Sequence, residues 1–266
     1  MTDLQNPKQF FRKQKLVMTL VLGGFFILIY GASAITNFTA ADAATAIPRV
    51  IVWMVTNLFP DAKALTRLPR ILDKLKDTIL MSIMASVSSS IFALIFALLG
   101  SRTTRPNQFF SVISRAIASI NRNIPVAAWA MIFLISFGQS SFTGYLALFF
   151  ATFGFLTRAF METIDEASAK PVQALRAAGA HELQIIAQAV MPASLPQMLS
   201  WVLYMIETNI RSATLVGLLT GSGIGFMFSI YYKSLQYHSA ALVVLSIVIV
   251  VLAIEMISNT LRRIIL

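Results

Sequence analysis

Two charged residues, Glu207 and Arg211, lie inside residues 195–219, an otherwise apolar stretch long enough to cross a membrane. Because residues four apart share one face of a helix, the carboxylate and the guanidinium can pair. Charges at membrane depth are costly and usually face a partner or a cavity. Arginine also offers fixed N–H donors to phosphate-like groups. The sequence therefore leaves two interpretations open: a structural ion pair, or part of an oxyanion path that includes Asn209 and Thr214.

No set of residues typical of catalysis, metal binding or nucleotide binding accompanies this pair. The chain has no Cys and only two His, which excludes a thiolate metal site and argues against a zinc site. A P-loop requires a Gly-Lys pair, and the chain contains none. The run from Gly221 to Gly225 lacks the Gly-x-Gly-x-x-Gly spacing of a dinucleotide site. We therefore expect no catalytic residue, no metal and no cofactor bound by this chain.

The composition is that of a membrane protein. Of the 266 residues, 57% are apolar and 12% are charged, with a mean hydropathy of +0.76, whereas soluble domains carry about 25% charged residues. The net charge of +10 is the kind of excess that cytoplasmic Lys and Arg give to membrane proteins, so we expect no nucleic-acid partner. The composition predicts an all-α polytopic protein.

Six apolar stretches predict about six transmembrane helices, at residues 16–35, 78–99, 124–137, 142–160, 195–219 and 239–257. The first could be a signal peptide ending near Ala34, but it is longer than a typical signal core, so we favour an uncleaved helix. The third is short for a straight crossing. Residues 107–121, interrupted by Arg115 and Asn121, are predicted to form a cytoplasmic or shallow helix.

The chain is predicted to divide into a cytoplasmic tail at residues 1–15, a first span with an extracytoplasmic segment at 16–77, and a core at 78–263. Within the second part, apolar residues recur at helical spacing over 65–79 with basic residues between them, which predicts an amphipathic helix lying on membrane lipid. These basic residues count against an outer position. Most other Lys and Arg fall inside if both termini are cytoplasmic, as the positive-inside rule favours.

A polar hairpin is predicted at residues 165–192, between the fourth and fifth spans. Pro171 suits the first turn of a helix, where its missing N–H has no partner to lose. Gly179 suits the position after a helix end, where the backbone needs a positive φ. A second short helix is predicted to follow and to be stopped by Pro192.

This hairpin resembles the EAA loop of ABC importer permeases, which has the pattern Glu-Ala-Ala, three residues, Gly, nine residues, Ile, one residue, Leu-Pro. Ala174 and the spacing from Gly179 to Pro192 agree with the pattern, whereas Gln173 and Leu175 depart from it. The resemblance implies a type I importer fold and a contact with an ATPase subunit. The residues it implicates in this ATPase coupling are Gln173, Ala174, Gly179, His181, Glu182 and Pro192.

Three further segments resemble one branch of that family, the phosphonate and phosphite importers. They are residues 122–125 (Arg-Asn-Ile-Pro), residues 207–214 (Glu-Thr-Asn-Ile-Arg-Ser-Ala-Thr), and Gly217 with the glycine run at 221–225. The resemblance implies translocation of a phosphonate or related phosphorus oxyanion. It adds to the path residues, which become Arg122, Asn123, Pro125, Glu207, Asn209, Arg211 and Thr214.

The resemblance also implies partners in a bacterial cytoplasmic (inner) membrane. They are two ABC ATPase subunits, which carry the ATP and Mg, and a periplasmic or lipid-anchored solute-binding protein. One hairpin per chain and no internal repeat imply a second copy of the chain, as a homodimer. The alternatives left open are an ABC permease for another small solute, such as methionine or phosphate, an intramembrane enzyme, and a channel.

Overall fold

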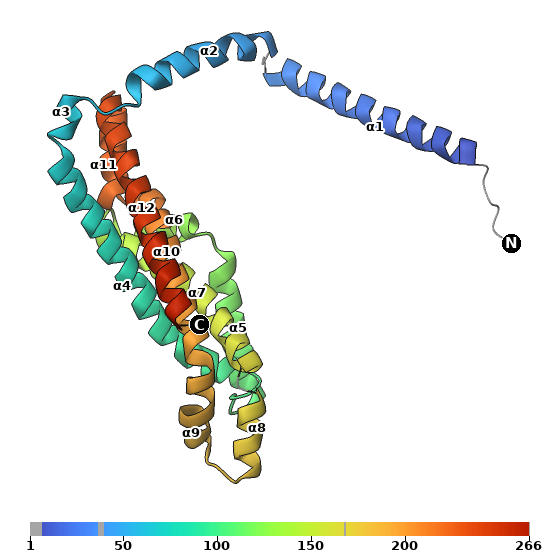
Figure 1. The fold of residues 1–266 in the computed structure, drawn as a ribbon, viewed down its shortest axis with the longest axis vertical. Helices are drawn as coiled ribbons and strands as arrows, with labels where there is room; N and C mark the ends of the chain where they lie inside the picture. Colours follow the sequence, from blue (N-terminus) through green and yellow to red (C-terminus); the bar gives the residue numbers. More distant parts are fainter. Residues whose placement is uncertain (1–6, 37–39, 168, 266) are drawn as a thin grey trace. The chain divides into compact units, whose positions relative to one another are not determined.

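A computed structural model describes residues 7–36, 40–167 and 169–265 of the chain, and these residues form helices and turns without any strand. They fall into two compact units, Met1–Asn57 and Leu58–Leu266. Figure 1 shows the course of the chain through both units. The expectation of an all-α protein is confirmed.

The first unit contains α1 (Pro7–Thr36) and α2 (Ala40–Asn57). The described side chains of α1 are apolar from Leu16 onwards and almost all are exposed, as expected of a helix that faces lipid. Because α1 continues through the small residues at 32–34, the helix is longer than the signal-peptide interpretation requires.

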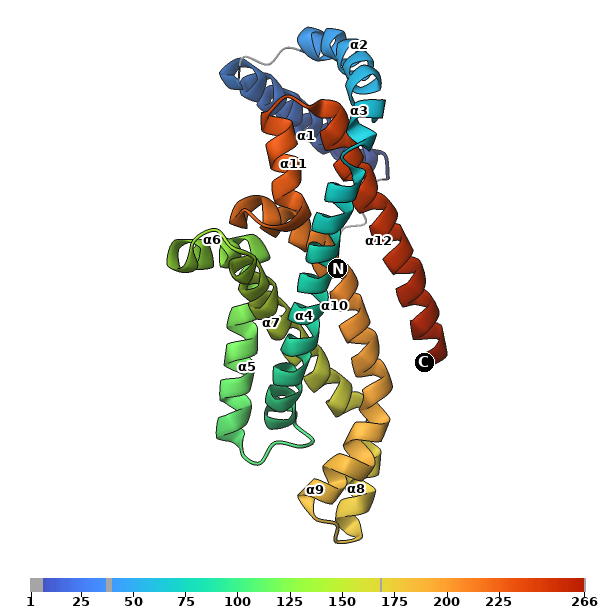
Figure 2. The same cartoon turned by 90° about the vertical axis from the view of Figure 1, so that its left-hand side faces the viewer.

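The second unit is a helical bundle with three long helices at its centre, α4 (Leu68–Gly100), α7 (Ser141–Ala167) and α10 (Met191–Thr220). Four others pack around them: α5 (Gln108–Asn123), α6 (Val126–Phe137), α11 (Gly223–Lys233) and α12 (Tyr237–Ile265). Figure 2 shows α4, α7 and α10 crossing in the middle of this unit.

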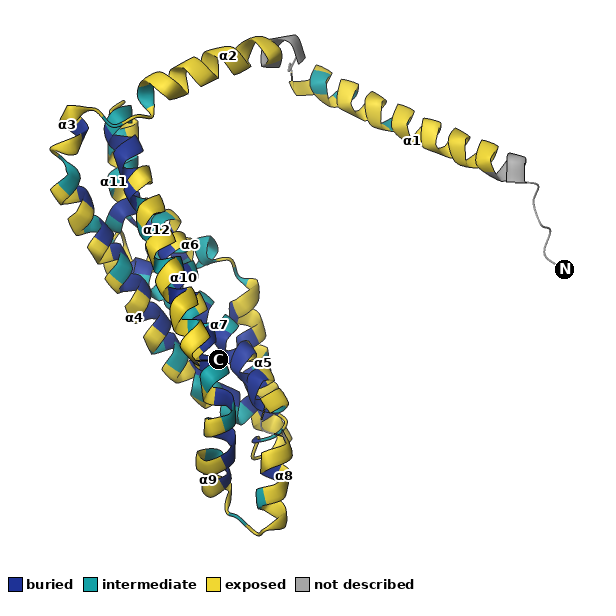
Figure 3. Cartoon of the chain, viewed as in Figure 1, coloured by how far each residue is buried: buried dark blue, intermediate teal, exposed yellow. Residues whose placement is uncertain are grey.

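The centre of the bundle is built from small residues on α4 facing large ones on α7. Ala93 and Ala97 are fully buried beside Leu156 and Phe160, and small side chains let membrane helices approach closely. The buried residues line the inner faces of the helices, while the outer faces are exposed (Figure 3). The exposed outer faces are rich in apolar residues, which is typical of a bundle surrounded by lipid.

Five helical segments among the described residues are long and apolar enough to cross a membrane, and the pair α5 and α6 makes a sixth if it is one span. This count agrees with the prediction of about six. The two helices of that pair meet at an angle of 92°, because Ile124 leaves the helical conformation and Pro125 caps α6 with extended backbone.

Residues 107–121 form a helix as expected, and this helix belongs to the bundle. It is α5, which packs along α7 and α4 (Figure 2). Its buried face consists of small or polar residues, Ser111, Ser114, Ala118 and Asn121. A face of this kind cannot be recognised in the sequence as a buried apolar face, although it suits close helix packing. The short third span is therefore the second half of a bent segment that begins with α5.

The expectation of a separate interfacial helix at residues 65–79 is wrong. Residues from Leu68 onwards are the first turns of α4, which runs without a break to Gly100, and α3 (Ala62–Leu65) precedes it. At 1.5 Å per residue, the 33 residues of α4 extend about 50 Å. Part of the apolar side of these turns faces protein, because Ile71 and Leu75 are buried with Ile224 and Leu242, while Leu72 is 49% exposed.

The glycine run at residues 221–225 turns the chain from α10 into α11. Gly221 ends α10 with a φ of 69°, and Gly223 has a φ of 60°, a region that residues with a Cβ avoid. Gly225 serves a different need, because a Cβ there would lie 1.9 Å from the carbonyl oxygen of Thr214. The run therefore makes a tight turn followed by a backbone-to-backbone contact between α11 and α10.

Candidate functional site

The predicted hairpin projects from the end of the bundle at which α7 finishes and α10 begins (Figure 1). Its first arm is α8 (Ala169–Ala177), which has Pro171 in its first turn as predicted. Gly179 has a φ of 80°, so the predicted positive φ is confirmed. The N–H of Gly179 donates to the carbonyl of Arg176 and that of Ala180 to the carbonyl of Leu175. These two bonds are a Schellman motif, which fixes the turn.

The second arm joins α10 without a stop. It consists of α9 (Glu182–Ile185) and a π-helical turn, Ile186–Val190. His181 caps α9, because its Nδ1 accepts from the N–H of Leu183 while Gln184 accepts from the N–H of His181. Pro192, expected to stop this helix, is instead in the first turn of α10, where a proline is tolerated.

The hairpin has a buried side and an exposed side. Val172, Ile185, Ala189 and Val190 are buried in the core cluster around Phe160. All six predicted coupling residues are exposed, namely Gln173, Ala174, Gly179, His181, Glu182 and Pro192. Leu183, an apolar residue that is not among the predicted coupling residues, is 72% exposed beside them. The hairpin therefore offers a mixed polar and apolar surface on a backbone anchored from within.

Polar contacts connect the hairpin to the loop between α4 and α5. Oδ1 of Asp165, at the end of α7, accepts hydrogen bonds from the Ser101 hydroxyl (2.5 Å), the Thr103 N–H (3.1 Å) and the Thr103 hydroxyl (3.0 Å). Nη2 of Arg176 donates to the Thr103 carbonyl and pairs with Glu182, both at 3.2 Å. A movement of the hairpin would therefore break these hydrogen bonds or displace the loop with it.

The predicted pair of Glu207 and Arg211 is present and has a third member. Oε1 of Glu207 lies 3.0 Å from Nη2 of Arg211, and Oε2 lies 3.3 Å from Nη2 of Arg262 on α12. The side chain of Glu207 is 9% exposed, that of Arg262 26% and that of Arg211 48%. Arg262 could not be predicted as a member, because it lies after the last apolar stretch of the sequence, at residues 239–257. The triad ties α10 to α12.

The structure separates the other polar residues predicted on α10 from this triad. Asn209 is 3% exposed and its amide donates to Ser86 of α4 at 2.9 Å and to Thr152 of α7 at 2.7 Å. This position argues for a tie between the three central helices. The hydroxyl of Thr214 is buried without a hydrogen-bond partner among the described residues.

The remaining predicted path residues gather elsewhere, between α5 and α7. Arg122 and Asn123 line a cavity of about 220 Å³, and Pro125 marks the bend that follows. The rest of the lining is Arg115, Ala118, Ser119 and Arg158. No residue of α10 belongs to this lining, so the structure does not bring the two predicted groups together. Arg115 and Arg158 appear as members of this group only once α5 is packed against α7.

A multi-span helical bundle that carries an exposed hairpin defines the class of protein, a polytopic membrane protein. The family described as binding-protein-dependent transport system inner membrane component matches residues 90–266. The chain belongs to this family. It is a permease subunit of an ABC importer, a transport component and not an enzyme, and membership implies an ATPase and a solute-binding protein as partners.

Two curated relatives illustrate the similarity. The phosphite transport system permease protein PtxC of Stutzerimonas stutzeri is 31% identical over 189 residues, which cover 71% of this chain and 69% of the relative. The phosphate-import permease protein PhnE of Mycolicibacterium smegmatis is 26% identical over 190 residues, which cover 71% of this chain and 36% of that one.

Two solved structures share the fold. One is the MetNI methionine ABC transporter in an inward-facing conformation, with a TM-score of 0.63 at 19% identity, covering 74% of this chain and 96% of that one. The other is an amino acid ABC transporter with histidines, with a TM-score of 0.64 at 12% identity, covering 75% of this chain and 95% of that one. At these identities the likeness supports the fold alone.

Proposed function

We propose that this permease translocates a phosphonate, phosphite or related phosphorus oxyanion that a solute-binding protein delivers. Two curated relatives named for phosphite and phosphate transport support this substrate class. The arginine-rich cavity between α5 and α7 supports it independently, because guanidinium groups match the geometry of phosphate-like oxygens. The alternative solute methionine finds support only in a fold likeness.

The main support for the transport mechanism is the hairpin, which has exposed residues on one side and is anchored in the core on the other. We propose that its exposed residues, from Gln173 to Glu182, dock on an ATPase subunit, with Leu183 as an apolar contact. ATP and Mg would be bound by that ATPase and not by this chain. One hairpin per chain suits a homodimer above two ATPase subunits. A mass measurement of the purified complex tests this, and a single permease copy per two ATPases would contradict it.

The first prediction concerns the orientation, which we propose to be cytoplasmic for the hairpin and both termini. The natural chain has no Cys, so single introduced cysteines report accessibility without further changes. We expect Ala178→Cys and Arg263→Cys to react with a membrane-impermeant maleimide only after the cytoplasmic side is opened. Ser234→Cys, between α11 and α12, should react from outside. Outside labelling of Ala178→Cys would exclude contact with a cytoplasmic ATPase.

The second prediction tests the coupling role through Gly179→Val. A β-branched residue is strained at a φ of 80°, and no atom lies within 4 Å of a Cβ placed there, so the strain is confined to the turn. We expect the variant to assemble in the membrane but to lose most solute-stimulated ATP hydrolysis and uptake of labelled phosphite in proteoliposomes holding the whole complex.

The matched control for this prediction is Ala178→Val, the same side chain on the preceding exposed residue, which has no positive φ. It should keep more coupling than Gly179→Val, because it adds the same side chain to the proposed docking surface without a positive φ. Equal loss in both variants would mean that added bulk, and not the turn, causes the defect. Normal coupling in Gly179→Val would remove the turn from the mechanism.

A further inference from the structure

The cavity between α5 and α7 gathers three guanidinium groups in one place. Arg115 and Arg122 are seven residues apart on α5, so they lie on one side of that helix. Arg158 faces them from α7. The two helices touch backbone to backbone nearby, because a Cβ on Gly154 would lie 2.5 Å from the backbone N of Arg122. The arginines are therefore carried by a rigid pair of helices, and we name the cavity that they line the arginine cavity.

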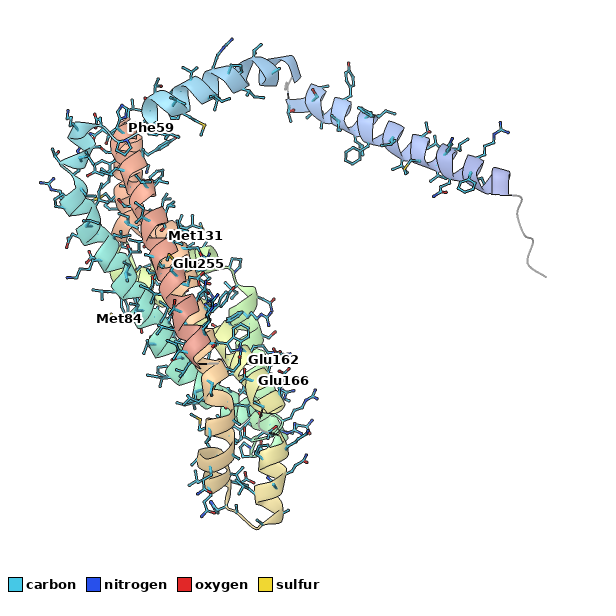
Figure 4. The ribbon with its side chains drawn as sticks, in the orientation of Figure 1. Phe59, Met84, Met131, Glu162, Glu166 and Glu255 are labelled. Carbon is cyan, nitrogen blue, oxygen red and sulfur yellow. The ribbon has the colours of Figure 1, made fainter. Side chains whose placement is uncertain are left out.

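The arginine cavity holds more positive than negative charge. Glu162 pairs with Arg158 at 2.5 Å, and Figure 4 shows Glu162 and Glu166 along this part of α7. Arg115 donates from Nε to the carbonyl of Gly100 at 3.1 Å. The guanidinium of Arg122 lines the cavity without a hydrogen bond or ion pair to any described residue. The lining therefore carries three guanidinium groups, of which Arg158 is paired with a glutamate outside it. Like charges in a concave site repel unless an anion joins them.

We propose that the arginine cavity binds a phosphoryl oxyanion, that is, a tetrahedral group with two or three charged oxygens. A guanidinium group can donate two parallel hydrogen bonds to such oxygens. A phosphoryl group has three oxygens for three arginines, whereas a carboxylate has only two. Ser119 and Asn123 also line the cavity, where the Asn123 amide donates to the Ser119 carbonyl at 2.8 Å. Two sources share this chemistry, a soluble anion such as a phosphonate and the phosphate of a lipid headgroup. The assignment of the cavity to a soluble phosphonate depends on the proposed function. The binding of a phosphoryl group does not depend on it.

Binding is tested on the whole complex in nanodiscs of zwitterionic lipid, by phosphorus NMR titration with methylphosphonate. We expect saturable binding that Arg122→Gln weakens at least tenfold. Arg122→Lys should recover only part of it, because a lysine keeps the charge but loses the fork. The matched control is Arg263→Gln, which removes one exposed guanidinium at the end of α12 and should leave binding unchanged.

A second variant guards against misfolding. Ser119→Glu keeps all three arginines and adds a carboxylate at an exposed residue of the lining, and it should also weaken binding at least tenfold. If neither Arg122→Gln nor Ser119→Glu alters binding, or if the wild type binds no methylphosphonate and retains no anionic lipid through Arg122, the proposal is overturned.

The two sources are separated by repeating the titration in phosphatidylglycerol nanodiscs. Unchanged methylphosphonate binding assigns the cavity to a soluble anion. Binding that phosphatidylglycerol displaces, together with loss of retained lipid in Arg122→Gln, assigns it to a headgroup, and both results support a phosphoryl site. Phosphite uptake is measured in parallel. If phosphite is taken up but nothing binds at the arginine cavity, only this inference is contradicted. If methylphosphonate binds but no phosphorus anion is taken up, only the proposed function is contradicted.

Discussion

Replacing Gly225 by Val is expected to abolish most folded permease. A Cβ at this position would lie 1.9 Å from the carbonyl oxygen of Thr214 and 2.8 Å from the N of Leu218, and these are backbone atoms of α10 that cannot move without the helix. Overpacking of a core commonly costs about 1–3 kcal/mol and more where the backbone must shift. Because α11 would have to leave α10, we expect the apparent melting temperature of the detergent-purified protein to fall sharply.

The matched control is Gly23→Val on α1. That glycine is also within a helix, and nothing lies within 4 Å of the Cβ it would receive. Its variant should retain nearly the wild-type yield and melting temperature. A stable Gly225→Val protein with the same melting temperature would show that α11 does not lie against α10 as described.

Replacing Glu207 by Gln is expected to cause the second large loss. The change leaves Arg211 and Arg262 without the carboxylate that both of them share. Breaking a buried ion pair by removing one partner costs about 3–5 kcal/mol, and the partial exposure of Arg211 places this change toward the lower end. The yield of monodisperse protein and its melting temperature measure the effect. Glu166→Gln is the control, because Glu166 is exposed and makes no ion pair with a described residue.

Two double variants distinguish a structural role of the triad from a role in the translocation path. Glu207→Gln with Arg262→Gln leaves only the half-exposed Arg211, whereas Glu207→Gln with Arg211→Gln leaves the more buried Arg262. We therefore expect the first double variant to recover more stability than the second. Restored phosphite uptake in the first would assign the triad to structure. Restored stability without uptake would place the carboxylate or Arg262 in the path.

The sequence predicts those features that depend on local backbone chemistry. Gly179 has the positive φ that its place after α8 requires. Glu207 and Arg211 pair because a spacing of four residues places them on one helix face. The overall number of spans also follows from apolar runs. In each case, a short stretch of chain determines the outcome.

The features that the sequence does not reveal depend on contacts between distant segments. Ile71 and Leu75 are buried against α11 and α12, whereas Leu72 is 49% exposed, and periodicity alone does not distinguish these two surroundings. Arg262 meets Glu207 only because α12 packs beside α10. Similarly, Arg158 joins Arg122 only because Gly154 lets α7 contact α5. The helix at α5 is predicted, but its polar buried face gives no sign in the sequence that it packs within the bundle.

The π-helical turn at Ile186–Val190 determines the direction in which the hairpin points. It holds one more residue than an α-helical turn, since the N–H of Met191 donates to the carbonyl of Ile186, five residues back. In an α-helix each residue turns the chain by about 100° and advances it by 1.5 Å. If the turn became α-helical, His181 and Leu183 would therefore swing about 100° around the axis of α10 with little translation. One extra residue thus sets the angle around the axis of α10 at which the proposed docking surface faces.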